Sequence, residues 1–328
     1  MPFAGEDDFL RLIDAHFPNA APGLILGRGD DAAVIQHPGP IAVSSDLFLE
    51  DVHFRRSYFT AAAIGRKALA VNLSDLAAMG AQPLGFTLNI GAPPDLASDF
   101  WPEFFAAMAQ TAARHKAVLA GGDLSRCERL AVSVTVWGGL GPAGRFLRRG
   151  QGRPGDFLFV VGELGLARAG LLGLEATGRA ALTQFPAACR AHLDPTALIK
   201  AGLLLAGIAA VRGLMDVSDG LLMDLPRFLG PGLGASLDLH GFPLHAETVR
   251  YAASAGVDPI RFALEGGEDY ALLGCVAPEG TGELKKRLPG ARLIGVIGAA
   301  PGVWLGQSPV ATGGFDHFRP AGSPKGAK

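Results

Sequence analysis

Hydrophobic and polar positions follow two periods along this chain, which predict strands and helices in irregular alternation. In the first half, short runs of branched apolar residues predict strands over 41–45, 84–90 and 130–137. Helical spacing predicts a long helix over 61–79, ended by Gly80, and another over 98–115 with Ser98 as its N-cap.

The same two periods continue beyond residue 156. They predict strands at 157–161, 214–218, 235–239 and 270–276, and helices at 166–176, around 195–210 and at 221–229. Between the halves, GRFLRRGQGRPGD (144–156) breaks the pattern with glycines, a proline and four arginines. We therefore predict an α+β fold of two α+β domains, residues 1–148 and 149–328.

Composition narrows the class of protein. The 328 residues exceed the usual span of one hydrophobic core, and with 49% hydrophobic and 18% charged residues the chain is not of disordered type. A net charge of -2 gives no basic field for nucleic acid or anionic lipid. The longest uncharged apolar run, 201–211, is too short to span a bilayer. We predict no nucleic-acid and no membrane partner.

Cysteine usage and the first residues indicate a compartment. The three cysteines, Cys127, Cys189 and Cys275, form no CxxC pair, which argues against a disulfide framework and fits a reducing environment. The start MPFAGEDDFL is acidic where a signal peptide would be basic. We expect a cytoplasmic protein.

Common catalytic signatures are missing, and one motif misleads. No Gly-Lys dipeptide, HExxH or GxSxG occurs, which excludes a Walker-type phosphate loop and weakens protease and hydrolase hypotheses. The segment GRGDDA (27–32) fits a loose dinucleotide pattern. However, its two carboxylates would face a pyrophosphate, and the following AAVI favours a strand over the required helix.

Acidic residues are few, yet many stand beside Gly, Ser or Asn at predicted element ends and among apolar neighbours. Taken one by one, such residues are often caps or turns. Together, many oxygen ligands without cysteine or clustered histidine favour a hard cation, Mg²⁺ before Zn²⁺. The set is Asp30, Asp31, Asp46, Asp75, Asp123, Asp216, Asp219, Glu268 and Asp269.

Asp75 carries the strongest signal of this set. On a helical wheel it lies within about 60° of Ile64 and Ala68, on a face that should be buried. A buried carboxylate needs a cation, a hydrogen-bond network or a proton, or a partner such as Arg66. Later in the chain, strand alternation puts Asp216 and Ser218 on one face, and Asp219 occupies a helix N-cap position.

Glycine pairs and arginines add features suited to a phosphate. Gly121-Gly122 and Gly266-Gly267 would let backbone amides approach an anion closely. An arginine cluster could clamp the same anion, or could simply be a solvated interdomain linker. From the residues alone we infer a Mg²⁺-dependent enzyme acting on ATP or a similar polyphosphate, with its acceptor open. The cluster comprises Arg145, Arg148, Arg149 and Arg153.

Longer motifs, taken together and in order, carry a resemblance to a known family. They are GDDAAVI, SSDLFLEDVHF, KALAVNLSDLAAMGAQP, GGDLSR, GRFLRRGQGRPGD, MDVSDGLLMDL, ALEGGEDYALL and the terminal GGFDHF. This series resembles the thiamine-monophosphate kinase family, in the superfamily named for aminoimidazole-ribonucleotide synthetase. The resemblance covers nearly the whole chain.

The resemblance implies an activity and an architecture. It implies direct in-line transfer of the ATP γ-phosphoryl group to thiamine monophosphate, giving thiamine diphosphate and ADP, the last step of thiamine diphosphate biosynthesis. ATP would be the co-substrate and several Mg²⁺ ions the cofactors. It also implies a homodimer whose N-terminal domains form a β-barrel across the two chains, with a C-terminal α/β-sandwich domain.

The resemblance also assigns roles to individual residues. Glu268 would complement the thiazolium cation of the acceptor, and Phe315 would stack on one of its rings. The implied Mg²⁺ ligands are Asp31, Ser44, Ser45, Asp46, Asp75, Asp123, Asp216 and Asp219. The implied ATP contacts are Phe105, Gly122, Asp123, Arg149 and Ser218, and the implied substrate contacts are His53, Glu268 and Phe315.

Three departures from the family pattern and two rival functions accompany this assignment. Ser44-Ser45-Asp46 replaces a common STD or TTD, Leu124 replaces a common Thr, and residues 165–167 read Gly-Leu-Ala where many members have Gly-Asp-Ser. If that turn assists phosphate binding, this chain would do so with backbone only. The alternatives are another ATP-using member of the superfamily, such as an aminoimidazole-ribonucleotide or selenophosphate synthetase, or a non-catalytic Mg²⁺-nucleotide-binding regulator.

Overall fold

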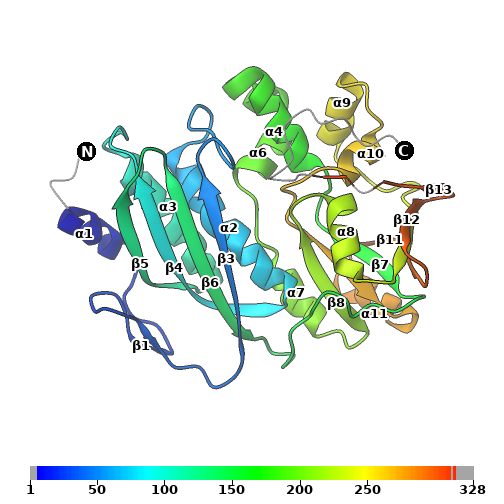
Figure 1. The fold of residues 1–328 in the computed structure, drawn as a ribbon, viewed down its shortest axis with the longest axis horizontal. Helices are drawn as coiled ribbons and strands as arrows, with labels where there is room; N and C mark the ends of the chain where they lie inside the picture. Colours follow the sequence, from blue (N-terminus) through cyan, green and yellow to red (C-terminus); the bar gives the residue numbers. More distant parts are fainter. Residues whose placement is uncertain (1–5, 312, 315–328) are drawn as a thin grey trace.

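The computed structural model describes residues 6–311 and 313–314, which fold into two large β-sheets and a separate two-stranded sheet, with helices packed between and around the large sheets (Figure 1). The N-terminal sheet has the strand order β3-β6-β4-β5, antiparallel except for the parallel pair β4 and β5. Its elements are α1 (Glu6–His16), the hairpin β1 (Leu24–Leu26) and β2 (Val34–Ile35), β3 (Ile41–Leu49), α2 (Ala61–Ala78), β4 (Ala81–Ala92), α3 (Phe100–His115), β5 (Val118–Arg126) and β6 (Ala131–Leu140).

The C-terminal sheet has seven strands in the order β13-β12-β9-β11-β7-β10-β8, with only β12 and β9 parallel. Its strands are β7 (Phe157–Val161), β8 (Val211–Val217), β9 (Gly234–Leu237), β10 (Ala271–Val276), β11 (Ala291–Gly298), β12 (Gly302–Leu305) and β13 (Ser308–Pro309). Its helices are α4 (Leu166–Thr177), α5 (Ala181–Gln184), α6 (Pro186–Leu193), α7 (Ile199–Ala206), α8 (Leu221–Leu229), α9 (Ala246–Ser254), α10 (Pro259–Leu264) and α11 (Thr281–Arg287), with 3₁₀ turns at Gly178–Ala180 and Pro278–Gly280.

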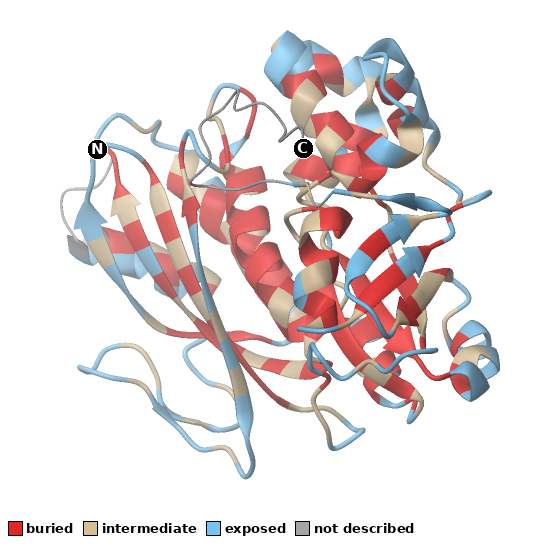
Figure 2. Cartoon of the chain, turned by 45° about the vertical axis from the view of Figure 1, so that its right-hand side comes forward, coloured by how far each residue is buried: buried red, intermediate tan, exposed pale blue. Residues whose placement is uncertain are grey.

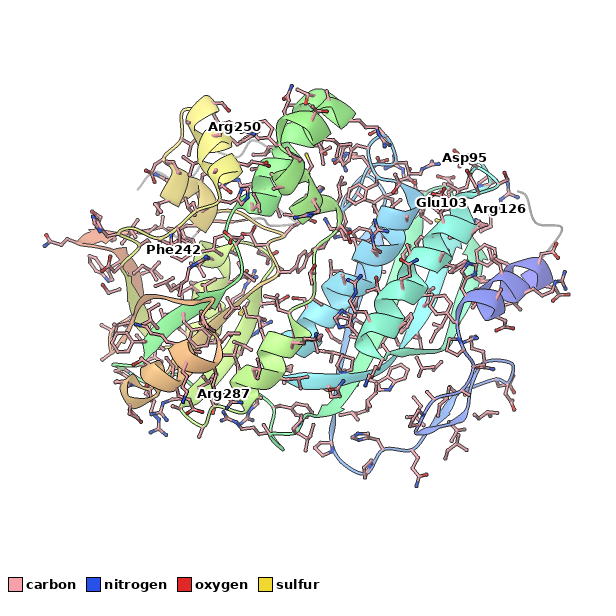
Figure 3. All side chains as sticks on the ribbon, turned by 180° about the vertical axis from the view of Figure 1, so that it is seen from behind. Asp95, Glu103, Arg126, Phe242, Arg250 and Arg287 are labelled. Atoms are coloured by element: carbon pink, nitrogen blue, oxygen red, sulfur yellow. The ribbon has the colours of Figure 1, made fainter. Side chains whose placement is uncertain are left out.

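Helix α2 lies between the two sheets and is buried around almost its whole circumference (Figure 2). It begins at the N-cap Thr60, whose hydroxyl accepts the Ala63 N–H at 3.1 Å, and it ends where Gly80 adopts φ +61°. A helix that is buried on all sides belongs to a core, so the few polar side chains of α2 need partners there. Seen from behind, α2 runs between α3 and α7 (Figure 3).

The hydrophobic core around α2 is shared by both halves of the chain. One continuous cluster joins Ile64 and Leu73 of α2 to Leu205 of α7 and to Leu214 and Leu272 in the C-terminal sheet. A second cluster lies on the other face of that sheet, under α8. The two sheets are therefore not separate globular units, because α2 and α7 pack between them in one shared core.

The linker over 144–156 is hydrogen-bonded to both halves, although most of its residues are exposed. The Leu147 N–H donates to the Met79 carbonyl at 2.9 Å, and the Gly150 N–H donates to the Phe228 carbonyl at 2.8 Å. The Arg145 guanidinium donates to three carbonyls at the end of α7 and the start of β8, those of Ala206, Ile208 and Val211. Arg145 thus holds the linker to α7 and β8 through three backbone carbonyls, which makes it a structural residue and not part of an anion clamp.

Most predicted elements are present, with local differences at their ends. The helix predicted from Ser98 begins at Phe100 with Asp99 as its N-cap, and the helical region around 195–210 narrows to α7. GRGDDA forms the turn between β1 and β2 and leads into a strand, as predicted. Within the part of the chain that the structure describes, no helix is both long and apolar enough to traverse a bilayer.

The close contact between α2 and α7 depends on Gly202. A Cβ added there would lie 2.1 Å from the Ala77 carbonyl oxygen of α2, whereas a Cβ on Gly173 of α4 would meet only ordinary contacts at 3.5 Å or more. We expect Gly202→Ala to lower the free energy of unfolding by about 1–3 kcal/mol through overpacking. Gly173→Ala, a matched helical control, should be neutral or slightly stabilising. Urea unfolding followed by circular dichroism measures both, and equal effects would contradict the packing argument.

Candidate functional site

Three carboxylates gather where α2 lies between β3 and β8. The Ser44 hydroxyl of β3 donates to Asp75 Oδ2 at 2.5 Å, and the Ser74 hydroxyl of α2 donates to Asp216 Oδ2 of β8 at 2.8 Å. The Asp46 N–H donates to the Asn72 side-chain oxygen at 3.1 Å. Helix α2 therefore fixes acidic groups from both sheets, and we call Asp46, Asp75 and Asp216 the carboxylate cluster.

The carboxylate cluster carries more negative charge than the chain compensates. Burial and the nearby Asp75 raise the pKa of Asp46 to about 6 and that of Asp216 to about 7. Burial also raises the pKa of Asp75, although the Ser44 hydroxyl and the Arg149 charge oppose that rise. Arg149 is exposed on the linker, and its charge acts to lower the pKa of both Asp75 and Asp216. Electrostatically, this is a place where a cation would stabilise the ionised carboxylates.

The donor atoms of the cluster suit Mg²⁺ but form only part of a coordination shell. Hydroxyl and carboxylate oxygens are the ligands that a hard divalent ion prefers. Among residues 6–311 and 313–314, no three Asp, Glu, His or Cys side chains converge as a ready-made metal centre. The cluster therefore fits Mg²⁺ whose remaining ligands are oxygens from water or phosphate, as Mg²⁺ commonly has.

Two predicted metal ligands lie on the opposite face of the N-terminal sheet. The Ser45 hydroxyl lies 2.8 Å from the Thr135 hydroxyl of β6, on the face away from α2. Asp123 alternates with Leu124, which packs into the core, so Asp123 also faces away. It belongs to β5, on the other edge of the sheet from β3, roughly 14 Å away at the usual strand spacing. Within a single chain, Ser45 and Asp123 therefore do not reach the carboxylate cluster.

Two further predicted ligands also lie outside the cluster. Asp31 is exposed in the β1–β2 turn. Asp219 pairs with Arg227 at 2.5 Å and is not a helix N-cap. The N-cap of α8 is Gly220, and the Asp224 carboxylate accepts the N–H groups of Ser218 and Asp219, just before the helix. Asp224 was missed because it lies inside the apolar pattern of the helix, where no cap is sought.

The predicted ATP contacts divide in the same way. Phe105 is completely buried in an aromatic group with Phe9, Phe17 and Trp101, so it is a core residue and the structure contradicts its assignment as an ATP contact. Arg149 and Ser218 are accessible near the cluster. For the last predicted contact, Gly122, strand packing explains the glycine, because a Cβ there would lie 1.8 Å from a carbonyl oxygen of β4.

The GGEDY segment is held by internal contacts. The Asp269 carboxylate accepts the N–H groups of Gly165 at 2.7 Å and Ala167 at 3.3 Å, at the start of α4. The turn that departs from the family pattern thus has its amides occupied by Asp269, and these are not free for a phosphate. Gly266 and Gly267 lack room for a Cβ against Gly165 and the Ser218 carbonyl.

Glu268 has two partners that sequence reasoning missed. Its carboxylate lies 3.1 Å from Lys67 Nζ on α2 and 2.6 Å from His192 Nδ1 on α6. Burial would raise the pKa of Glu268, but Lys67 and His192 outweigh it and lower that pKa to about 2. The available signal was the lysine of α2, which lies in a helix whose pattern is mostly apolar.

The remaining predicted acceptor residues are His53 and Phe315. His53 is half-buried beside Phe48, and its Nδ1 accepts the Leu49 N–H at 3.0 Å, which fixes the ring in the turn after β3. Phe315 lies outside the described residues, so its role stays a prediction.

Comparisons with known proteins agree with this architecture. The description "AIR synthase related protein, N-terminal domain" matches residues 29–140, and its C-terminal counterpart matches residues 153–303. Thiamine-monophosphate kinase of Mycobacterium tuberculosis is 38% identical over 256 residues, covering 77% of this chain and 75% of that protein.

Solved structures extend the agreement to the fold. The thiamine-monophosphate kinase of Stenotrophomonas maltophilia superposes with a TM-score of 0.77 at 32% identity, covering 92% of this chain and 96% of its own. The complex of AaThiL with AMPPCP and TMP gives 0.76 at 30% identity, covering 96% and 97%.

The two-domain α+β fold, with acidic residues at its interdomain junction, thus defines an AIR synthase related protein. Within that superfamily the chain belongs to the thiamine-monophosphate kinase family, which confirms the resemblance found in the sequence. Residues 141–152 lie between the two matched domains, and the boundary near residue 148 stays a prediction.

The raised pKa of Asp216 predicts how the stability of metal-free protein depends on pH. Its folded-state pKa of about 7 exceeds the ordinary value of 3.8, so folding favours the protonated form. This contribution is complete below pH 4 and is lost as pH rises through about 7. With Asp216→Asn, the free energy of unfolding at pH 8 should exceed that of wild type by on the order of 1–3 kcal/mol.

At pH 4 the two chelator-treated proteins should be nearly equal in stability. Urea titrations at both pH values test this, and an unchanged pH dependence in the variant would show that Asp216 is not the responsible group.

Proposed function

We propose that this protein transfers the γ-phosphoryl group of ATP to thiamine monophosphate, giving thiamine diphosphate and ADP. The observation that carries the proposal is the carboxylate cluster at the junction of the two sheets, with the charge of the exposed Arg149 acting on it. Membership of the thiamine-monophosphate kinase family, with similarity over nearly the whole chain, supports this choice of substrates.

Phosphoryl transfer requires positioning and charge neutralisation more than a covalent partner. When bound, Mg²⁺ supplies neutralisation of phosphate charge; Ser44 and the three carboxylates would hold it. Ser44 orients Asp75, and Ser74 orients Asp216, so the ligands are set before the substrates arrive. Arg149 would draw the phosphates of ATP toward the cluster, and transfer would be direct and in line.

Other assignments support the proposal less directly. Ser218, which directly follows β8 near the cluster, would contact ATP, while His53, Glu268 and Phe315 would meet thiamine monophosphate. Further ions at Asp31, Ser45, Asp123 and Asp219 stay a proposal from the family resemblance, as does a cytoplasmic location.

A homodimer is part of the proposal. Strand β3 is an edge of the N-terminal sheet and exposes Ile41, Val43 and Leu47, with side chains 47–60% accessible, on the face away from α2. The neighbouring β1–β2 hairpin exposes Ile25 as well. An apolar edge strand is a liability unless something covers it, and a second copy of this chain would do so.

A turnover assay decides between the proposal and its rivals. With ATP and Mg²⁺ present, ADP release should require thiamine monophosphate and should not occur with thiamine or with aminoimidazole precursors. Turnover with an aminoimidazole precursor would identify another member of the superfamily. Nucleotide binding without ADP release would identify a regulator.

Asp75 should be essential for turnover and dispensable for folding. Asp75→Asn keeps an oxygen that can accept the Ser44 hydroxyl but removes the central charge of the cluster, so Mg²⁺-dependent turnover should fall by at least about a thousandfold, as when a charge-stabilising group is lost. Circular dichroism should show an intact fold. Asp7→Asn, at an exposed acid of α1, is the control and should have wild-type activity. A folded Asp75→Asn protein with normal activity would refute the metal-site assignment.

Charges placed on the exposed face of β3 should separate the dimer. Sedimentation of wild type should give twice the chain mass of 33.9 kDa. The double substitution Val43→Lys and Leu47→Lys should give the single-chain mass, whereas Val257→Lys, an exposed apolar site in the C-terminal half, should leave the dimer intact. A wild-type monomer with full activity would contradict the proposed assembly.

A further inference from the structure

Lys67 of α2 is a buried cation. At such a buried position a helix normally carries an aliphatic side chain. Its side chain is 0% exposed, and its ammonium lies over the rings of Phe59 and Phe48 at 5.5 and 6.0 Å. A lysine is almost never fully buried unless its charge is paired. Its anionic partner is Glu268, which belongs to the other half of the chain.

The Glu268 carboxylate lies against two buried nitrogen groups, and one of them donates a hydrogen bond to it. Lys67 Nζ lies 3.1 Å from Oε1, and His192 Nδ1, on a side chain 1% exposed, lies 2.6 Å from Oε2. The hydrogen bond from Lys67 holds the carboxylate in place, and the His192 ring packs beside Oε2 and lies 3.4 Å from Lys67 Nζ. Burial, then the charge of Lys67, lowers the pKa of His192, although the neighbouring Glu268 carboxylate opposes this.

The backbone of Glu268 is also constrained. Its φ is +63° and that of Tyr270 is +48°, a left-handed conformation that costs energy in residues other than glycine. The Glu268 N–H donates to the Ser218 carbonyl at 2.7 Å, and the Tyr270 N–H donates to the Val217 carbonyl at 2.9 Å. The segment that carries Glu268 is therefore bonded to the chain just after Asp216.

One helix face sets both ends of the site. Lys67 and Ser74 are seven residues apart, so they lie on the same face of α2, roughly 10 Å apart along its axis. Ser74 holds Asp216 of the cluster, and Lys67 holds Glu268. The residue that holds the carboxylate cluster and the residue that holds Glu268 are thus two turns apart on one buried helix.

We infer that Lys67, supported by His192, is a positioning residue that holds the Glu268 carboxylate charged and oriented for the thiazolium of the acceptor. The inference rests on the proposed function. Without the ammonium, the half-buried carboxylate would lose its fixed orientation and favour its neutral form, so its contact with a cationic acceptor would weaken.

The test measures KM for thiamine monophosphate and for ATP in Lys67→Met. Loss of one oriented charged contact should raise the acceptor KM about tenfold, while the ATP KM stays within about twofold. The matched control is Arg66→Met, which removes the neighbouring interdomain pair of Arg66 with Asp194, 3.0 Å apart, and should change neither KM.

A double-substitution cycle shows whether Lys67 acts through Glu268. Glu268→Gln alone should raise the acceptor KM, and adding Lys67→Met to it should cause no further rise. Hydrogen exchange of the 264–273 peptide should accelerate in Lys67→Met and not in Arg66→Met, which reports the loosened segment without reference to activity.

Histidine variants keep the test decisive if Lys67→Met does not fold. His192→Asn retains an N–H that can reach Glu268, and should keep a near-wild-type acceptor KM. His192→Leu removes that donor and should raise the acceptor KM selectively. Equal behaviour of these two variants would overturn the supporting role of His192.

Three results would overturn the inference while wild-type turnover is normal. The first is an equal rise of both KM values in Lys67→Met. The second is a fall of the acceptor KM in this variant, which is expected if Lys67 only screens the charge of Glu268. The third is a loss of stability in this variant with unchanged kinetics. Absence of wild-type turnover with thiamine monophosphate would instead overturn the proposed function, and this inference with it.

Discussion

The burial of polar side chains on α2 is the constraint on which the rest of this structure depends. A helix between two sheets would be most stable if wholly apolar, yet this one carries Lys67, Asn72, Ser74 and Asp75. Each meets a partner from a flanking strand or loop, so the sheets can dock on α2 only in the register that satisfies these groups. The apolar contacts supply stability, and the polar ones select one arrangement.

The sequence predicted the regular elements and the family because both depend on patterns among residues that are close together along the chain. The strand at 157–161 and the helix at 61–79 need only their own periodicity, and both are present in the structure. Motif order along the chain likewise identified the thiamine-monophosphate kinase family. The prediction that Asp75 belongs to a buried charged group also came from a local pattern, its place on an apolar helix face.

What local patterns could not supply is which residues meet in space. Asp46 and Asp123 follow similar motifs, yet strand order puts them on opposite edges of one sheet. Phe105 and Arg145 were predicted to contact ligands. In the structure Phe105 packs in the core, and Arg145 donates to backbone carbonyl oxygens. Lys67 and His192 gave little signal, because their importance comes from Glu268, some 200 and 76 positions further along the chain.

The hydrogen-bonded linker and shared core restrict how this molecule can move. Domain closure about a hinge requires a junction with few contacts, whereas here Arg145 ties the linker to α7 and one core runs through both sheets. A rigid-body rotation of the halves would expose that core and break the bonds of α2. Entry of substrates and escape of product therefore fall to surface segments, whose rearrangement can be fast because it leaves the two-sheet frame untouched.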